Sequence, residues 1–159
     1  MKKIVFLTLA AQFVILGSTY GSHLVSINWI EKSDSPIWMN CHYGGVIGSV
    51  WYHAGGFTHG GVGQRICQAY DLETDQWLPM VYMNKPHHNH GVVAYGGRLY
   101  AFGGISGWNI FHPELEVYDP LSDSWSYLAP MPVLRRFFGY AISDDRIYVT
   151  GGGTQLFSL

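Results

Sequence analysis

Short apolar runs alternate with glycine-rich and polar turns along most of the chain, and no stretch has a convincing helical period of about 3.6 residues. In the middle of the chain the pattern predicts four strands, at residues 91–95, 99–102, 114–118 and 124–128. Gly96-Gly97 suits a two-residue hairpin turn, and Asp119-Pro120 opens another turn. A long loop over residues 105–113 separates the second strand from the third. The pattern therefore predicts a four-stranded antiparallel unit.

A spacing of 48 residues recurs for several residue types. It joins Tyr52, Tyr100 and Tyr148; Gly55-Gly56, Gly103-Gly104 and Gly151-Gly152; Tyr70-Asp71 and Tyr118-Asp119; Trp77 and Trp125; and Gly91 and Gly139. Four-stranded repeats of this length are typical of β-propeller blades. Small residues in the first strand suit the crowded propeller axis, and a tryptophan in the fourth suits the wider rim. We expect Asp71 and Asp119 to brace their turns by hydrogen bonds to the backbone.

The order Gly-Gly, Tyr-Asp, Trp and then Met beside Pro resembles the kelch repeat. The best instance runs from Leu99 through Gly103-Gly104 and Tyr118-Asp119 to Trp125 and Met131-Pro132. The resemblance covers about residues 38–153, with a looser first unit in which Tyr43 stands where Gly91 and Gly139 stand later. It implies an all-β fold, a partial kelch-type β-propeller of about two and a half to three four-stranded antiparallel blades.

The length of 159 residues allows about three blades of this size, whereas a closed propeller needs about four to eight. We therefore expect residues 22–159 to form an incomplete propeller domain, most simply as a fragment of a longer kelch protein. An oligomer that completes the ring from several chains is the alternative. Open blade edges and faces would favour self-association.

The N-terminal segment has two interpretations. Lys2 and Lys3 precede the apolar run 4–16, and small residues follow, so residues 1–21 fit a signal peptide cleaved after Gly21. They equally fit degenerate blade strands, with a strand over residues 5–9, a turn at Ala10-Ala11 and a second strand over 13–16. The apolar run is too short for a comfortable membrane span, so no membrane contact is expected unless residues 4–16 are retained. Localisation follows the same choice: secreted if the segment is cleaved, cytoplasmic on the family resemblance.

Composition excludes several classes of function. The formal charge of −2 lacks the basic excess of a nucleic-acid binder. No nucleophile motif, phosphate-binding loop or cofactor signature is visible, so we expect no cofactor. His87-His88-Asn89-His90 is the densest histidine cluster, but no carboxylate or cysteine stands at ligand spacing, so a structural role is favoured over a metal site. Whether Cys41 and Cys67 pair is left open.

Long loops on one face of the predicted propeller are the candidate site. In an up-and-down blade, the second-to-third and fourth-to-first connections emerge together, which groups residues 57–64, 80–89, 105–113 and 131–137. Exposed Trp, Arg and His on a rigid scaffold are typical of binding surfaces. The candidate partner-binding residues are His59, His87, His88, Trp108, Asn109, Arg135 and Arg136. The kelch resemblance further implies that Arg135, four residues before Gly139, lines a pocket at the channel mouth, whereas His87 departs from that pattern.

Two functions follow from the resemblance. The first is a protein-interaction module, either the substrate-recognition part of a cullin ubiquitin-ligase adaptor or an actin-binding protein. The second is part of an extracytoplasmic kelch-fold enzyme of the sugar-processing or copper-oxidase type. The missing catalytic residues favour the first, with a protein partner bound at the long-loop face.

Overall fold

A computed structural model describes residues 4–10, 26–108 and 110–154. The chain divides into two units, Met1–Pro36 and Ile37–Leu159. The described parts contain strands and no helix, as the sequence predicts. The strands are β1 (Ile4–Ala10), β2 (Ser26–Lys32), β3 (Tyr43–Ile47), β4 (Val50–Ala54), β5 (Cys67–Asp71), β6 (Gln76–Leu78), β7 (Gly91–Tyr95), β8 (Arg98–Phe102), β9 (Leu115–Asp119), β10 (Ser124–Leu128), β11 (Gly139–Ser143) and β12 (Arg146–Thr150).

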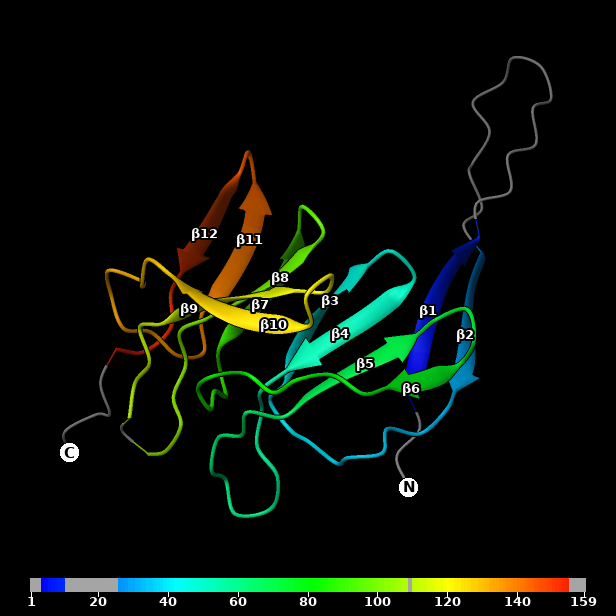
Figure 1. Ribbon diagram of the computed structural model, residues 1–159, viewed down its shortest axis with the longest axis horizontal. Coiled ribbons are helices and arrows are strands. Elements are labelled where there is room, and N and C mark those ends of the chain that lie inside the picture. Colours follow the sequence, from blue (N-terminus) through cyan, green and yellow to red (C-terminus); the bar gives the residue numbers. More distant parts are fainter. Residues whose placement is uncertain (1–3, 11–25, 109, 155–159) are drawn as a thin grey trace. The chain divides into compact units, whose positions relative to one another are not determined.

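The second unit is built from blades (Figure 1). Blade 1 is the antiparallel sheet β3-β4-β5-β6, and blade 2 is the sheet β7-β8-β9-β10. The pair β11-β12 repeats the first two strands of a blade and is called blade 3 here. The predicted strands of the middle unit are confirmed to within a residue at either end. Two and a half blades follow β2, which agrees with the blade number that the repeat predicts.

The turns between the third and fourth strands also repeat from blade to blade. Asp71 Oδ1 accepts hydrogen bonds from the backbone N–H groups of Glu73 and Thr74, at 2.8 and 3.1 Å. Asp119 Oδ1 accepts one from the N–H of Leu121 at 2.9 Å. The expected bracing of these turns is therefore confirmed. Because these bonds stabilise the charged carboxylate, they lower the pKa of both aspartates below the usual value.

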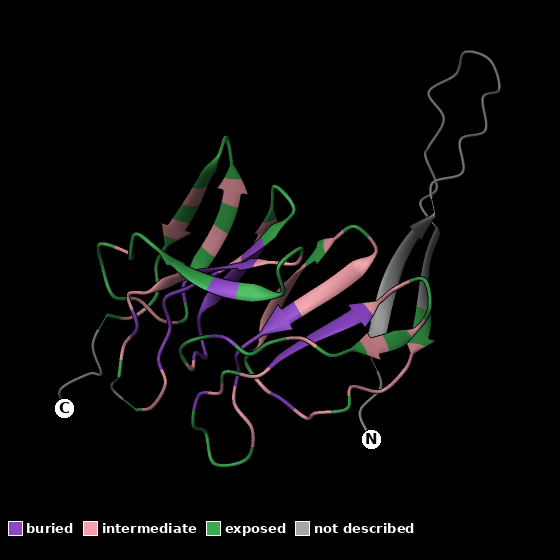
Figure 2. Ribbon diagram, in the orientation of Figure 1, coloured by how far each residue is buried: buried purple, intermediate pink, exposed green. Residues whose placement is uncertain are grey.

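Inner strands of successive blades lie side by side, β3 beside β7 and β7 beside β11. Their small residues have a steric reason: a Cβ atom added at Gly45 of β3 would lie 2.6 Å from the Cβ of Ala94 of β7. Figure 2 shows the buried residues gathered where blades 1 and 2 meet, whereas β11 and β12 alternate between exposed and half-buried positions. The most deeply buried part of the core is thus the interface between the two complete blades. We call such an interface between neighbouring blades a seam.

Two apolar clusters fill the seams. The first, between blades 1 and 2, contains Ala54, Cys67, Met83, Val92, Leu99, Ala101, Tyr118 and Trp125. The second, between blades 2 and 3, contains Val93, Phe102 and Phe138 with half-buried neighbours from β11 and β12. Burial raises the pKa of the Cys67 thiol to about 12. Cys41 is exposed and Cys67 buried, and both are free thiols, so the two cysteines do not pair.

The first unit contains one hairpin, whose pairing differs from the predicted one. Ile4 lies opposite Lys32 and Ala10 opposite Ser26, so β1 pairs with β2. The strand predicted over residues 5–9 is present, but a tight turn at Ala10-Ala11 is wrong because residues 11–25 connect the two strands. The second predicted strand, residues 13–16, lies outside the described residues. Cleavage after Gly21 stays a prediction. No helix in the described residues is long and apolar enough to cross a membrane.

Replacement of Trp125 tests this packing. Trp125 is 9% exposed, its ring centroid lies 5.3 Å from that of Tyr118, and its Nε1–H donates to the Val81 carbonyl at 3.4 Å. We expect Trp125→Ala to lower the free energy of unfolding by about 3–5 kcal/mol, as large-to-small core changes do. Leu121→Ala, at a residue that is 99% exposed, is the control and should change almost nothing. Urea denaturation of both variants measures the difference, and equal midpoints would contradict the blade assignment.

Candidate partner-binding face

Backbone hydrogen bonds join the long loops of neighbouring blades in a repeated pattern. The N–H of Gly56 donates to the His87 carbonyl at 2.7 Å, and the N–H of Gly104 donates to the Arg135 carbonyl at 2.8 Å. Isolated bridges recur with the same spacing, at Asn40 with Phe57, His88 with Ile105, and Arg136 with Gly153. The linker that enters each blade is therefore fixed to the loop that follows a diglycine. We call the surface formed by residues 57–64, 80–89, 105–113 and 131–137 the loop face.

The repeated diglycines are required by this geometry. Gly103 and Gly104 have φ values of 67° and 83°. A Cβ atom at Gly104 would lie 2.5 Å from the His88 carbonyl oxygen, which is closer than any real side chain approaches. Only glycine combines a positive φ with this contact. The expected structural role of the diglycines is confirmed, and it places the loop face on rigid backbone.

His87, one of the predicted binding residues, lies inside the protein. It is 0% exposed, and its Nδ1 is 2.7 Å from the Gly103 carbonyl oxygen. Its Nε2 is 3.4 Å from Oε1 of Glu116. The expectation that His87 is exposed on the loop face is therefore wrong, because the linker that enters blade 2 turns this ring into the seam.

Glu116 is the buried residue that sequence reasoning missed. It is also 0% exposed, and its two carboxylate oxygens accept hydrogen bonds from the N–H groups of Asn84 and Lys85, at 2.8 and 2.9 Å. These bonds satisfy two linker donors that would otherwise be left without an acceptor in the seam. Its position in a strand, between two apolar residues, gives no signal of this role.

His88 is also buried rather than exposed. Its Nδ1 is 2.9 Å from Nδ2 of Asn89, and its ring lies 5.4 Å from that of Phe57. Burial lowers its pKa below the usual histidine value, as it does for His90 and His112. Among the described residues, no group of three or more His, Cys, Asp or Glu side chains has the arrangement of a metal site. His88 and His90 are thus buried rings whose pKa values lie below the usual histidine value.

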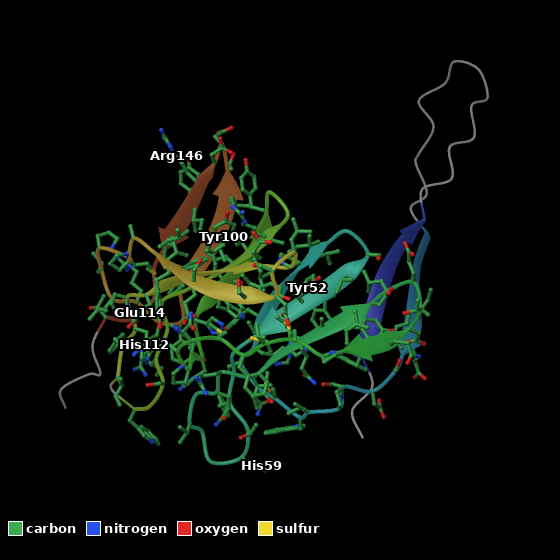
Figure 3. All side chains as sticks on the ribbon, in the orientation of Figure 1. Tyr52, His59, Tyr100, His112, Glu114 and Arg146 are labelled. Atoms are coloured by element: carbon green, nitrogen blue, oxygen red, sulfur yellow. The ribbon has the colours of Figure 1, made fainter. Side chains whose placement is uncertain are left out.

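Trp108 and His59 lie exposed in the two long loops that follow the diglycines. Trp108 is 86% exposed. His59 stacks on Trp38, with ring centroids 4.5 Å apart and an interplanar angle of 28°. Figure 3 shows His59 and Arg146 at opposite ends of the second unit, which separates the loop face from the tight turns between strands. Asn109, also predicted for this face, lies outside the described residues.

The two adjacent arginines take different environments. Arg135 is half-buried, and its Nη1 donates to the Gly151 carbonyl at 2.6 Å. The guanidinium carbon of Arg136 lies 5.8 Å from the ring centroid of Phe111 and 5.3 Å from that of Phe137. Such cation–π contacts hold a guanidinium beside exposed rings while it keeps its charge. Arg136 is thus surrounded by aromatic surface, whereas Arg135 contacts the backbone of blade 3.

Phe137 is a second residue that the sequence did not single out. It is 61% exposed and has a φ of 54°, an uncommon conformation for a bulky side chain. Cys41 and Asn89, with φ values of 49° and 54°, hold the same position in blades 1 and 2. The three residues share a backbone conformation and no side-chain type, so only their spacing of 48 residues could have revealed the position.

Charge is divided between the two ends of the blades. The four loops of the loop face carry Lys85, Arg135 and Arg136, and the carboxylate of Glu114, between the third loop and β9, lies 3.2 Å from Nδ1 of His112. The opposite turns contain the acidic residues Asp71, Glu73, Asp75, Asp119, Asp123, Asp144 and Asp145. Arg98 offsets part of that charge through an ion pair with Asp119 at 2.9 Å. The loop face therefore carries more cations than carboxylates although the chain has a net charge of −2.

Comparisons with known proteins agree with this arrangement. The kelch motif family matches residues 86–132. Kelch-like protein 15 of Danio rerio is 29% identical over 155 residues, covering 85% of this chain and 26% of the relative. Alpha-scruin of Limulus polyphemus is 27% identical over 145 residues, covering 89% of this chain and 16% of the relative. The chain thus spans about a quarter or less of the length of these relatives.

The fold also matches a solved structure. The structure of YjhT superposes with a TM-score of 0.72 at 16% identity, covering 81% of this chain and 49% of that one. At that identity the likeness shows the fold. Together with the family match, it identifies the sheets described above as kelch-type propeller blades.

The buried carboxylate gives a prediction for stability. Glu116→Ala leaves the N–H groups of Asn84 and Lys85 without their acceptors, at about 1–3 kcal/mol for each buried donor. We expect a loss of about 3 kcal/mol in the free energy of unfolding. Glu114→Ala, which removes a half-buried carboxylate 3.2 Å from His112, is the control and should cost less than about 1 kcal/mol. Equal losses in chemical denaturation would show that Glu116 does not hold the linker.

A second prediction concerns acid stability. Burial, followed by the nearby His42, lowers the pKa of His53 from 6.5 to about 3. The unfolded chain then binds a proton more readily than the folded one, so the free energy of unfolding falls as the pH drops from about 6.5 towards 3. His53→Gln should flatten this dependence, and exposed His59→Gln should leave it unchanged. Thermal melts between pH 7 and 4 test this, and an unchanged slope for His53→Gln would contradict it.

Proposed function

Because the chain belongs to the kelch-repeat family, we propose that its loop face binds a protein partner through an acidic segment. The separation of charge carries this proposal: the loops contain three cations beside the one carboxylate of Glu114, while the opposite turns are acidic. A cation-rich surface with exposed aromatic rings attracts a carboxylate-bearing peptide.

The proposed contact residues are those that remain accessible. Trp108 and Phe137 supply large apolar area with few rotatable bonds, and Arg136 lies against the Phe137 ring. Aromatic and arginine side chains are the residue types enriched in binding hot spots. Arg135 and His59 contribute from the edge of the same surface, while His87 and His88 act indirectly by fixing the linker. Asn109, which lies outside the described residues, stays a predicted contact residue.

A binding role is favoured over an enzymatic one. The curated relatives named above are kelch-like proteins and a scruin. The histidines that would be the natural acid–base candidates are buried in the seam and have lowered pKa values. A buried imidazole cannot exchange a proton with a substrate directly. Substrate recognition for a cullin ubiquitin ligase and actin binding are both forms of the proposed protein-binding function, and the acidic partner segment suits either.

Site-specific cross-linking tests the proposal. A photoreactive amino acid at position 108 should capture a partner in cells, and the same group at position 121, in the opposite turn face, should not. With the captured partner in hand, Arg136→Ala should weaken binding by about 2 kcal/mol or more in a calorimetric titration. Affinity should also fall with rising ionic strength, because charge attraction is screened by salt.

A matched variant makes the result specific. Arg98→Ala removes an exposed cation from the turn end of blade 2, where it pairs with Asp119. It changes the net charge by the same amount as Arg136→Ala does. Because Arg98 lies at the turn end and not on the loop face, its loss should leave partner affinity unchanged. Equal capture from positions 108 and 121, or equal loss for the two arginine variants, would place the binding surface elsewhere.

A further inference from the structure

Two positions of the repeat hold residues of different charge in different blades. Met39, His87 and Arg135 stand 48 residues apart, and so do Gln68 and Glu116. Blade 1 has Met39 and Gln68 at the two positions, and blade 2 has His87 and Glu116. All four side chains are buried. The uncharged amide thus accompanies an apolar residue, whereas the carboxylate accompanies a residue that can take up a proton.

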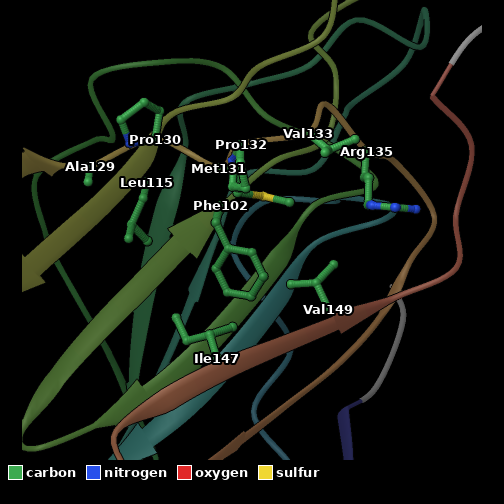
Figure 4. A pocket seen from close by; sticks show the side chains of 10 residues that line it. All are labelled: Phe102, Leu115, Ala129, Pro130, Met131, Pro132, Val133, Arg135, Ile147 and Val149. Atoms are coloured by element: carbon green, nitrogen blue, oxygen red, sulfur yellow. The ribbon is translucent and has the colours of Figure 1, made fainter.

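His87 and Arg135 make the same backbone contact. Nδ1 of His87 lies 2.7 Å from the carbonyl oxygen of Gly103, and Nη1 of Arg135 donates to the carbonyl of Gly151 at 2.6 Å. Gly151 stands 48 residues after Gly103, as Arg135, labelled in Figure 4, stands 48 residues after His87. An arginine that donates to a carbonyl keeps further N–H groups for a carboxylate, whereas a neutral imidazole has only one N–H. His87 can therefore replace an arginine fully only when both of its ring nitrogens carry protons.

The proton positions on His87 follow from its neighbours. A carbonyl oxygen can only accept a hydrogen bond, so Nδ1 carries a proton. In a neutral ring Nε2 would then have a lone pair, 3.4 Å from Oε1 of Glu116 and without a hydrogen bond to any described group. Glu116 accepts hydrogen bonds from the N–H groups of Asn84 and Lys85, and these bonds stabilise negative charge on it. Two acceptors would therefore face each other where both side chains are 0% exposed.

We propose that His87 carries a second proton, at Nε2, and that His87 and Glu116 form a buried ion pair whose formation depends on that proton. Removal of the proton leaves a lone pair facing a carboxylate, so the two side chains repel each other. Because the same carboxylate accepts the N–H groups of Asn84 and Lys85, a shift of Glu116 loosens the linker over residues 84–90. Residues 80–89 belong to the loop face, so the ion pair also regulates the partner site, a step that rests on the proposed function.

The groups around the ion pair leave the charge on His87. The titratable or charged residues near the pair are Cys67, Lys85, His88, His90, His112, Glu114 and Tyr127. Burial, followed by the charge of His87, lowers the pKa of both His90 and His112, so neither ring competes for the proton at pH 7. Burial raises the pKa of the Cys67 thiol to about 12, so this group is uncharged as well.

The ion pair gives stability a dependence on pH with a defined sign. An unfolded histidine loses its proton near about pH 6.5, whereas the proposed pair keeps the proton at Nε2 to higher pH. The folded chain then binds one proton more than the unfolded chain, so the free energy of unfolding falls as the pH rises above about 6.5. The contribution of His53 has the opposite sign and changes below pH 6.5, so the two effects are separate.

Nitrogen NMR of the histidine rings in the full 159-residue chain tests the proposal directly. At pH 7.5 we expect protons on both ring nitrogens of His87, whose signals are identified by their loss in His87→Gln. In Glu116→Gln, which removes the carboxylate charge, His87 should be neutral with a bare Nε2. His112, whose ring lies 4.9 Å from that of His87, should be neutral in both chains and is the internal control. A bare Nε2 on His87 of the unmodified chain would overturn the proposal.

Replacement of His87 by arginine gives a second measurement. His87→Arg can donate to the same carbonyl and the same carboxylate with a charge that does not titrate. Amide exchange of residues 84–90 should be the same in the two chains at pH 6.5 and at least tenfold faster in the unmodified chain at pH 9. Comparison at one pH removes the intrinsic effect of pH on exchange.

The linker that enters blade 3, residues 132–138, is the matched control because it already contains Arg135. Its exchange should be the same in both chains at both pH values. Equal exchange of residues 84–90 at pH 9 would contradict regulation by the ion pair. Neither measurement involves a partner, so a failure here is distinguishable from a failure of partner binding at the loop face.

Discussion

The hydrogen bond from the second glycine of each diglycine to the carbonyl of the next linker is the contact on which the rest of the structure depends. It occurs at Gly56 with His87 and at Gly104 with Arg135. The N–H of each of these two glycines, which have positive φ values, points to the linker of the next blade, and the absence of a Cβ atom lets the glycine pack against the linker that enters its own blade. Blade spacing, the course of the linkers and the position of every loop on the loop face follow from this contact.

Each linker between blades runs along a seam, so the same segment supplies residues to both the core and the surface. Each linker contributes both buried and exposed side chains. In the linker that enters blade 2, His87 is buried against Glu116 while Lys85 stays exposed. In the linker that enters blade 3, Arg135 lies against backbone while Arg136 and Phe137 form surface. Loops whose backbone is fixed by buried residues can present a fixed binding surface.

Periodicity in the sequence was sufficient to predict the fold, because a spacing that joins glycine, tyrosine, aspartate and tryptophan reflects backbone geometry. The diglycines, the aspartate-braced turns and the buried Trp125 were all predicted from that spacing. The site was less predictable, since residue type does not tell whether a linker side chain points into the seam. His87 and His88 were expected on the surface and are buried, and Glu116 gave no signal because its partners are backbone N–H groups. The N-terminal pairing was missed because β1 and β2 are separated by residues 11–25.

The most direct test of the central contact compares two glycines of the same loop region by substitution with alanine. Gly104 has a φ of 83°, and a Cβ there would lie 2.5 Å from the His88 carbonyl oxygen, whereas a Cβ at Gly107 would meet only the Ile110 side chain at 3.8 Å. Gly104→Ala should lower the free energy of unfolding by about 1–3 kcal/mol or more and speed amide exchange in residues 86–90. Gly107→Ala should do neither. Equal stability and equal exchange in the two variants would contradict the claim that the diglycine contact organises the blades and their loop face.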